Sequence, residues 1–300
     1  MNPGDAALRP VPFGATIGVI APAGPASADA VDAIAPWLKG RGYAARLFPG
    51  CRERQAYLAG DDRQRLADLH AAFADPAIDA IICMRGGYGS ARLLDKIDYA
   101  LIRRHAKPFV GYSDITALHL AFARSAGMSC IHGPMLTSDL VGREDPASAD
   151  ALFRMLSQGL VAGDALPCGA AKLTRVVSGT ARGRLVGGNL SVLCGLLGTP
   201  WEVDAGEAIL FIEDCGEEPY RIDRLLTQLR LAGKLGAAGG FLIGSFSDAE
   251  DPDPVIRELL MPFGKPMLSG WPSGHCRPNY PLPHNVEVVL DADRQRLSVA

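Results

Sequence analysis

The 300-residue sequence contains no apolar run of the ~18 residues that a membrane-spanning helix needs, and no basic N-terminal segment followed by an apolar core. Its seven cysteines form no CxxC pair and no cluster with histidine, which argues against a disulfide framework and against a metal site. We therefore expect a cytoplasmic protein with reduced thiols that neither enters a membrane nor binds a metal ion.

Excess charge of one sign is also lacking, because 30 basic residues face 33 acidic ones and the net charge is -3. Such a balance argues against a nucleic acid or an anionic membrane surface as partner. The glycine-rich segment RGGYGS (85–90) matches neither G-x-G-x-x-G nor G-x-x-x-x-G-K-[ST], and no lysine follows it. A nucleotide cofactor is therefore not indicated, although these glycines could still cradle a small anion.

Strand and helix patterns alternate through the first half of the chain, which is typical of a parallel sheet covered on both faces. The length and the 48% apolar content allow a core in each of two domains. From about residue 139 to 180 the pattern loosens, and more strand-like segments follow. We expect an α/β domain over 1–165 and a β-rich domain over 166–300. The expected elements of the first half are strands at 15–24, 44–50, 78–84 and 108–112, and helices at 28–42, 61–76, 90–97 and 114–127.

Ligands of such sheets bind beyond the carboxyl ends of the strands, where the loops 85–92 and 111–114 are expected. In the second loop Ser113 follows a strand and a glycine and precedes a helix, as a nucleophile elbow requires. The elbow pattern wants a second glycine where this chain has Ile115. The alternative is that Ser113 is an N-cap, a common role for serine at this position.

A nucleophilic serine needs a base, and usually a carboxylate that orients the base. His275 is the preferred base because it lies in 269–285, a stretch so rich in glycine and proline that we expect no regular structure there. His284 is its rival. The other histidines are expected on helices, in solvent or lining the cleft, and are His70, His105, His119 and His132.

Glu213 is the preferred carboxylate because it ends an apolar strand-like run, EAILFIED. Asp214 follows it directly, and Glu217 and Glu218 resemble charges that cap the next helix. The order Ser113, Glu213, His275 would place the nucleophile in one domain and its partners in the other, with the cleft between them.

The glycine-rich loop offers further groups to this cleft. The N–H of Gly86 or Gly87 could join that of Asp114 in an oxyanion hole. Arg85 and Arg92 could bind a substrate carboxylate, although a solvated or structural arginine is the more common role for each taken singly. Trp271 and Tyr88 are candidate cleft walls, with core packing as the alternative.

Taken in order, these segments resemble the LD-carboxypeptidase family of serine peptidases (S66), which includes the microcin C immunity peptidases. The resemblance covers nearly the whole chain. It is carried by VIAPAGP, CMRGGYGSARLL, KPFVGYSDITALHL, HGPM, LVGGNLSVLCGLLGTP, LFIEDCGEEPYRIDRLLTQL, GSF and the GH of PSGHCRPNYPLP.

The resemblance implies a triad of Ser113, Glu213 and His275, with an oxyanion hole from the backbone N–H groups of Gly86 and Asp114. It also implies an N-terminal domain like that of class I glutamine amidotransferases, a C-terminal β-rich domain, a homodimer and no cofactor. The implied reaction is the release of terminal D-alanine from murein tetrapeptides during cytoplasmic peptidoglycan recycling.

Two alternatives remain at this stage. An immunity-type peptidase would hydrolyse aminoacyl-sulfamoyl-adenylate-like toxins and should carry an aromatic loop, for which only Trp201 and Trp271 are candidates. A non-catalytic module would instead bind a small anionic ligand with the same loops.

Overall fold

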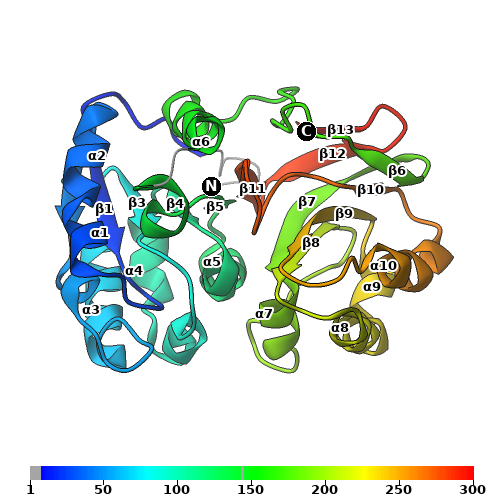
Figure 1. Ribbon diagram of the computed structural model, residues 1–300, viewed down its shortest axis with the longest axis horizontal. Helices are drawn as coiled ribbons and strands as arrows, with labels where there is room; N and C mark the ends of the chain where they lie inside the picture. Colours follow the sequence, from blue (N-terminus) through cyan, green and yellow to red (C-terminus); the bar gives the residue numbers. More distant parts are fainter. Residues whose placement is uncertain (1–7, 143–144) are drawn as a thin grey trace.

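The computed structural model describes residues 8–142 and 145–300, which form two sheets flanked by helices (Figure 1). Within these residues the first sheet has six strands, of which all but β11 run parallel. Parallel strands that are covered on both faces read as continuous apolar runs, and β3 and β4 are buried throughout. The spatial order is β11 (Leu282–His284), β5 (Cys130–His132), β4 (Phe109–Gly111), β3 (Ala80–Cys83), β1 (Thr16–Ile20) and β2 (Ala44–Leu47).

Two buried apolar clusters hold helices against the two faces of this sheet. One cluster packs α3 (Asp62–Ala74), α4 (Tyr99–Arg104) and α5 (Thr116–Ala126) on one face. The other packs α1 (Ala28–Asp32), α2 (Ile34–Gly40) and α6 (Pro146–Gln158) on the opposite face. Both clusters continue into the second sheet, so the two halves of the molecule share their core.

The second sheet is mixed and has seven strands in the described part of the chain. Its central strands β7 to β10 are parallel, and antiparallel strands flank them. Figure 1 shows this sheet curling beside the first, with α7 to α10 below it. The strands in spatial order are β13 (Arg296–Val299), β12 (Glu287–Asp291), β7 (Thr180–Asn189), β8 (Ile209–Cys215), β9 (Gly240–Ser247), β10 (Met267–Ser269) and β6 (Thr174–Val177). The helices are α7 (Leu190–Gly195), α8 (Pro219–Leu231), α9 (Lys234–Ala237) and α10 (Asp253–Leu260).

The predicted fold class is confirmed, and three local predictions are wrong. The single helix expected over 28–42 is two helices, because Pro36 has no N–H to donate to the Asp32 carbonyl and its ring crowds that oxygen. Ser90–Lys96 forms a 3₁₀ helix, and Gly89 before it has no side chain that could cap an α-helix. The glycine- and proline-rich stretch also contains a strand, β11, which tolerates Pro283 because it lies at a sheet edge.

The division at residue 165 stays a prediction; it falls between α6 and β6, and β11 returns to the first sheet. Among the described residues, no helix is long and apolar enough to cross a membrane.

Candidate active site

Ser113 lies directly beyond the carboxyl end of β4, in a strained backbone conformation. Its φ is +62°, a region that costs a non-glycine residue about 1–2 kcal/mol. No side-chain hydrogen bond caps the short 3₁₀ helix Ser113–Ile115 or α5 after it, so the predicted N-cap alternative is wrong. The side chain is partly exposed, and its Oγ lies 3.2 Å from Nε2 of His275.

Ile115 stands where the elbow pattern has a second glycine, and the strand β4 leaves room for its side chain. A Cβ on Gly111 would lie only 2.7 Å from Cγ2 of Ile115, so the missing side chain of Gly111 makes room for the isoleucine. The strand and the helical segment after Ser113 therefore approach closely, although the second glycine is absent.

Asp114 ties this elbow to the glycine-rich loop. Its buried carboxylate accepts a hydrogen bond from the N–H of Ser90 (2.8 Å), and the Ser90 hydroxyl donates to its carbonyl (2.5 Å). Burial raises the pKa of Asp114. On the other side of the elbow, a Cβ on Gly86 would lie 3.0 Å from Cβ of Ser113, so the two loops predicted to form the site are in contact.

Glu213 is fully buried in β8. It pairs in register with Asn189 of β7, whereas the pairing of β8 with β9 shifts register between Ile212 and Asp214. Such irregularities re-aim side chains. One carboxylate oxygen, Oε2, accepts hydrogen bonds from the backbone N–H of His275 (3.0 Å) and from its Nδ1 (2.7 Å).

His275 follows β10 in an irregular loop and reaches both other candidates. Gly274 before it has φ +101°, and a Cβ there would lie 2.2 Å from Oε2 of Glu213. With Nδ1–H donated to Glu213, Nε2 is left to accept the Ser113 hydroxyl. The His275 side chain is 19% exposed and Glu213 is 0% exposed, so the imidazole can meet a substrate while the carboxylate cannot.

The surroundings of His275 make it a stronger base. Burial lowers the pKa of His275, but the neighbouring Cys215 and Glu213 side chains raise it by more, so the pKa lies above its ordinary value. The ring of Tyr112 packs edge-on against the imidazole with centroids 4.9 Å apart. The Tyr112 hydroxyl donates to Asp139 (2.9 Å), which holds that ring in place.

Asp214, next to Glu213, has a different role. Its carboxylate accepts hydrogen bonds from the Asn189 amide (2.8 Å) and from the backbone and hydroxyl of Ser191 (2.9 and 2.8 Å). These bonds join β8 to the start of α7 and leave Glu213 as the carboxylate that faces the imidazole.

The remaining buried histidines stand apart from this relay. His119, His132 and His284 are buried, and their ring nitrogens have no hydrogen-bond partner among the described residues. His119 contacts the other two, with ring centroids 6.4 Å from His132 and 5.5 Å from His284. Burial lowers the pKa of all three, to about 3 for His132 and His284. His284, the predicted rival of His275, therefore lies in the core on β11.

For two other candidates of the cleft, the structure supports the alternative role. Trp271 is 1% exposed and belongs to the core. Arg92 forms an ion pair with Asp62, to which its Nε and Nη2 donate at 3.0 Å, and therefore has the structural role.

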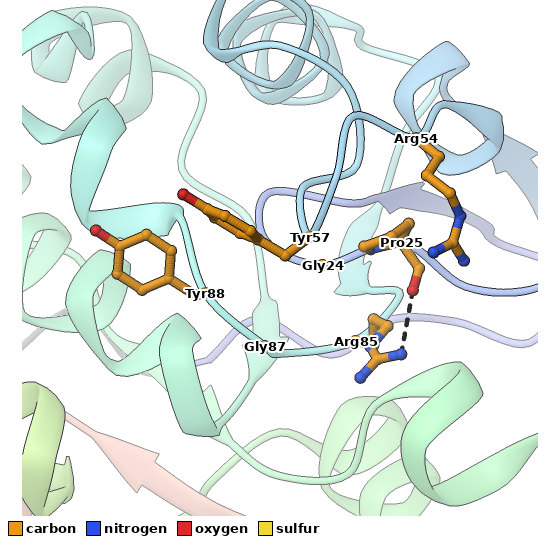
Figure 2. A pocket seen from close by; sticks show the side chains of 7 residues that line it. All are labelled: Gly24, Pro25, Arg54, Tyr57, Arg85, Gly87 and Tyr88. Atoms are coloured by element: carbon orange, nitrogen blue, oxygen red, sulfur yellow. Dashed lines mark hydrogen bonds between the residues drawn. The ribbon is translucent and has the colours of Figure 1, made fainter.

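Sequence reasoning missed a pocket of about 550 Å³ that lies beyond the carboxyl ends of β1, β2 and β3. Arg85 and Tyr88 of the glycine-rich loop line it, as do Arg54 and Tyr57 after β2. Figure 2 shows the two arginines at one end, near Pro25, and the two tyrosine rings at the other. This pocket depends on the order of the strands in the sheet, and local sequence patterns do not give that order.

No three His, Cys, Asp or Glu side chains of the described residues come close enough to hold a metal ion.

Comparison with known proteins supplies a family for this arrangement. Residues 17–133 match the LD-carboxypeptidase N-terminal domain, and residues 182–290 match the LD-carboxypeptidase C-terminal domain. A probable murein peptide carboxypeptidase of Bacillus subtilis is 40% identical over 93% of this chain and 89% of its own length. The murein tetrapeptide carboxypeptidase of Pseudomonas aeruginosa is 34% identical over 95% of this chain and 96% of its own.

Solved structures share the fold. The microcin C7 immunity protein MccF bound to glutamyl sulfamoyl guanosine superposes with a TM-score of 0.90 at 22% identity, covering 98% of each chain. A muramoyltetrapeptide carboxypeptidase from Oxalobacter formigenes has a TM-score of 0.81 at 28% identity, over 94% of this chain and 97% of its own. The matched domains and the identity along almost the full length show that this chain belongs to the LD-carboxypeptidase (S66) family.

Proposed function

We propose that this protein is a serine LD-carboxypeptidase that releases the terminal D-alanine from murein tetrapeptides. The observation that carries the proposal is the continuous relay from Ser113 through His275 to the buried Glu213, with contacts of 3.2 and 2.7 Å. Relatives of 34–40% identity that are named as murein peptide carboxypeptidases support the substrate class.

In the first half of the proposed reaction, Nε2 of His275 takes the Ser113 proton as Oγ attacks the scissile carbonyl carbon. Glu213 keeps the proton on Nδ1 and stabilises the imidazolium that forms. The negative charge that develops on the carbonyl oxygen is met by the backbone N–H groups of Gly86, on the glycine-rich loop, and of Asp114, directly after Ser113.

In the second half, the carbon–nitrogen bond breaks and the imidazolium gives its proton to the departing amine of D-alanine. An acyl-enzyme on Ser113 remains. His275 then takes a proton from water, whose oxygen attacks the ester carbonyl, and the proton returns to Ser113 as the shortened peptide leaves. Protons balance over the cycle, and one water molecule is consumed.

The immunity-type alternative gains no support from the tryptophans. Trp271 is buried, and Trp201 is partly buried against the core, so neither is a fully exposed ring of an aromatic loop. The homodimer and the cytoplasmic setting that the family resemblance implies stay predictions.

The test is mass spectrometry of L-Ala-D-Glu-diaminopimelate-D-Ala after incubation with wild type, Ser113→Ala or Ser157→Ala, in the presence of a chelator. Ser157 is an exposed serine on α6 and serves as the matched control. We expect wild type and Ser157→Ala to release D-alanine, and Ser113→Ala to lose at least ~10³-fold in rate while its circular dichroism is unchanged. Equal release by Ser113→Ala would refute the proposed nucleophile, and no release by wild type would refute the substrate.

A further inference from the structure

The pocket of Figure 2 lies at the topological switch point of the first sheet. β2 lies on one side of β1 and β3 on the other, so the chain after β1 and the chain after β3 leave the sheet in opposite directions. Open α/β sheets bind ligands at this crevice. Gly24 and Pro25 follow β1, and Arg85 and Gly87 follow β3, so both loops of the switch point line the pocket.

The pocket holds two positive charges without a local counter-charge. Within the described residues, no carboxylate forms an ion pair with Arg54 or Arg85, although many other arginines of the chain are paired in this way. Arg85 donates to the Pro25 carbonyl (3.1 Å) through Nη1, and its buried Nε has no partner among the described residues. Arg54 makes one long contact, 3.5 Å, with the Ala26 carbonyl.

The neighbouring Arg65 shows what an occupied guanidinium looks like here. It is 1% exposed, and it donates to the carbonyls of Pro22 (2.5 Å) and Gly89 (2.8 Å) and to Asp62. Arg65 therefore holds the loops after β1 and β3 together, whereas Arg85 makes a single hydrogen bond among the described residues.

Arg85 belongs to the loop that contacts Ser113, where the terminal residue of a peptide bound at the nucleophile would lie. A single residue spans at most about 3.6 Å, and the attacked carbon approaches the nucleophile to about 3.5 Å, so a terminal carboxylate lies roughly 7 Å from Oγ. Arg85 directly precedes Gly86, whose added Cβ would lie 3.2 Å from that Oγ.

We infer that Arg85, with Arg54 behind it, forms the subsite that binds the free terminal carboxylate of the substrate. This inference rests on the proposed function for the identity of the peptide. Arginine suits the task because its guanidinium binds a carboxylate with two parallel hydrogen bonds. The subsite would restrict the enzyme to the last residue of the peptide, since a chain that continued would place a neutral amide against the arginine.

The experiment compares the tetrapeptide with its C-terminal carboxamide on wild type, Arg85→Gln, Arg85→Lys and Arg92→Gln. Arg92→Gln is the control, since Arg92 is already bound to Asp62. In wild type, kcat/KM for the acid should exceed that for the amide by about 10- to 100-fold. Arg85→Gln should lower the ratio of the acid to the amide to between one and about three. Arg85→Lys should restore part of the wild-type ratio, and Arg92→Gln should leave the ratio unchanged.

Binding of the same two peptides to Ser113→Ala, with and without Arg85→Gln, separates this inference from the proposed function. Tighter binding of the acid that disappears with Arg85→Gln supports the subsite even if wild type cleaves neither peptide, in which case only the proposed reaction fails. An acid preference that survives Arg85→Gln in both assays overturns the subsite. An Arg85→Gln variant that loses the same factor of kcat/KM and of affinity for the acid and for the amide also overturns the subsite, because Arg85 would then only support the loop.

Discussion

Gly274→Ala tests whether the contact between Glu213 and His275 depends on the absence of a side chain at residue 274. The new Cβ would lie 2.2 Å from Oε2 of Glu213, and alanine would have to adopt φ +101°. Because Glu213 is 0% exposed, its carboxylate cannot swing into solvent to relieve the clash. We expect a backbone strain of about 1–3 kcal/mol. Separation of the carboxylate from the imidazole should lower kcat by about 10²- to 10⁴-fold, which corresponds to roughly 2.7–5.4 kcal/mol of activation free energy.

The matched control for this prediction is Gly233→Ala, between α8 and α9. Gly233 also has a positive φ, +76°, but an added Cβ would meet no atom within 4 Å. The Gly233→Ala variant should therefore lose about 1–2 kcal/mol of stability and keep the wild-type kcat. The assay is D-alanine release under saturating tetrapeptide, alongside urea unfolding of both variants. If Gly274→Ala retains a kcat within threefold of that of Gly233→Ala, the argued role of Gly274 is refuted.

Two further predictions concern pH. His275 acts as a base only when neutral, and its pKa is raised, so kcat/KM should fall with decreasing pH along a limb centred above pH 6.5. Glu213→Gln should move this limb to lower pH. An unmoved limb would contradict the pairing of Glu213 with His275. The lowered pKa values of His119, His132 and His284 stabilise the fold fully above about pH 6.5, and this stability is lost as the pH falls. Between pH 6.5 and 5, protonation linked to His132 and to His284 should each lower the free energy of unfolding by about 1.6 kcal/mol, measured by urea unfolding. A flat profile would contradict their burial as neutral rings.

Much of the first domain could be predicted because its information is local. Buried parallel strands are short apolar runs, and the loop that follows each strand necessarily lies at one edge of the sheet. This rule alone is enough to predict that Ser113 and the glycine-rich loop lie at the same edge. The same locality explains the errors, because Pro36 divides a helix whose apolar pattern runs through it, and Pro283 lies in a strand that pairs on one side only.

The meeting of three distant segments could not be predicted from local patterns. Sequence separations of 162 residues between Ser113 and His275, and of 62 between His275 and Glu213, carry no sign of contact. The family resemblance grouped these residues, whereas the physical causes are non-local: a register shift in β8 at Glu213 and the space left by Gly274. The Arg54–Arg85 pocket escaped prediction for the same reason, since it depends on the order of the strands in the sheet.

The proposed relay depends on how the two domains dock, because Ser113 belongs to the first and its partners to the second. Thr116, one helical turn after Ser113, accepts the backbone N–H of Asn189 at 3.1 Å through its Oγ1. Gly188 permits this approach, since a Cβ there would lie 2.5 Å from that oxygen. Asn189 is in turn the register partner of Glu213 on the adjacent strand. One hydrogen bond between the two domains and one strand pairing therefore link the segment of the nucleophile to the strand of the carboxylate, in addition to the shared apolar core. Loss of that bond would weaken this link while the pairing within each sheet stays intact.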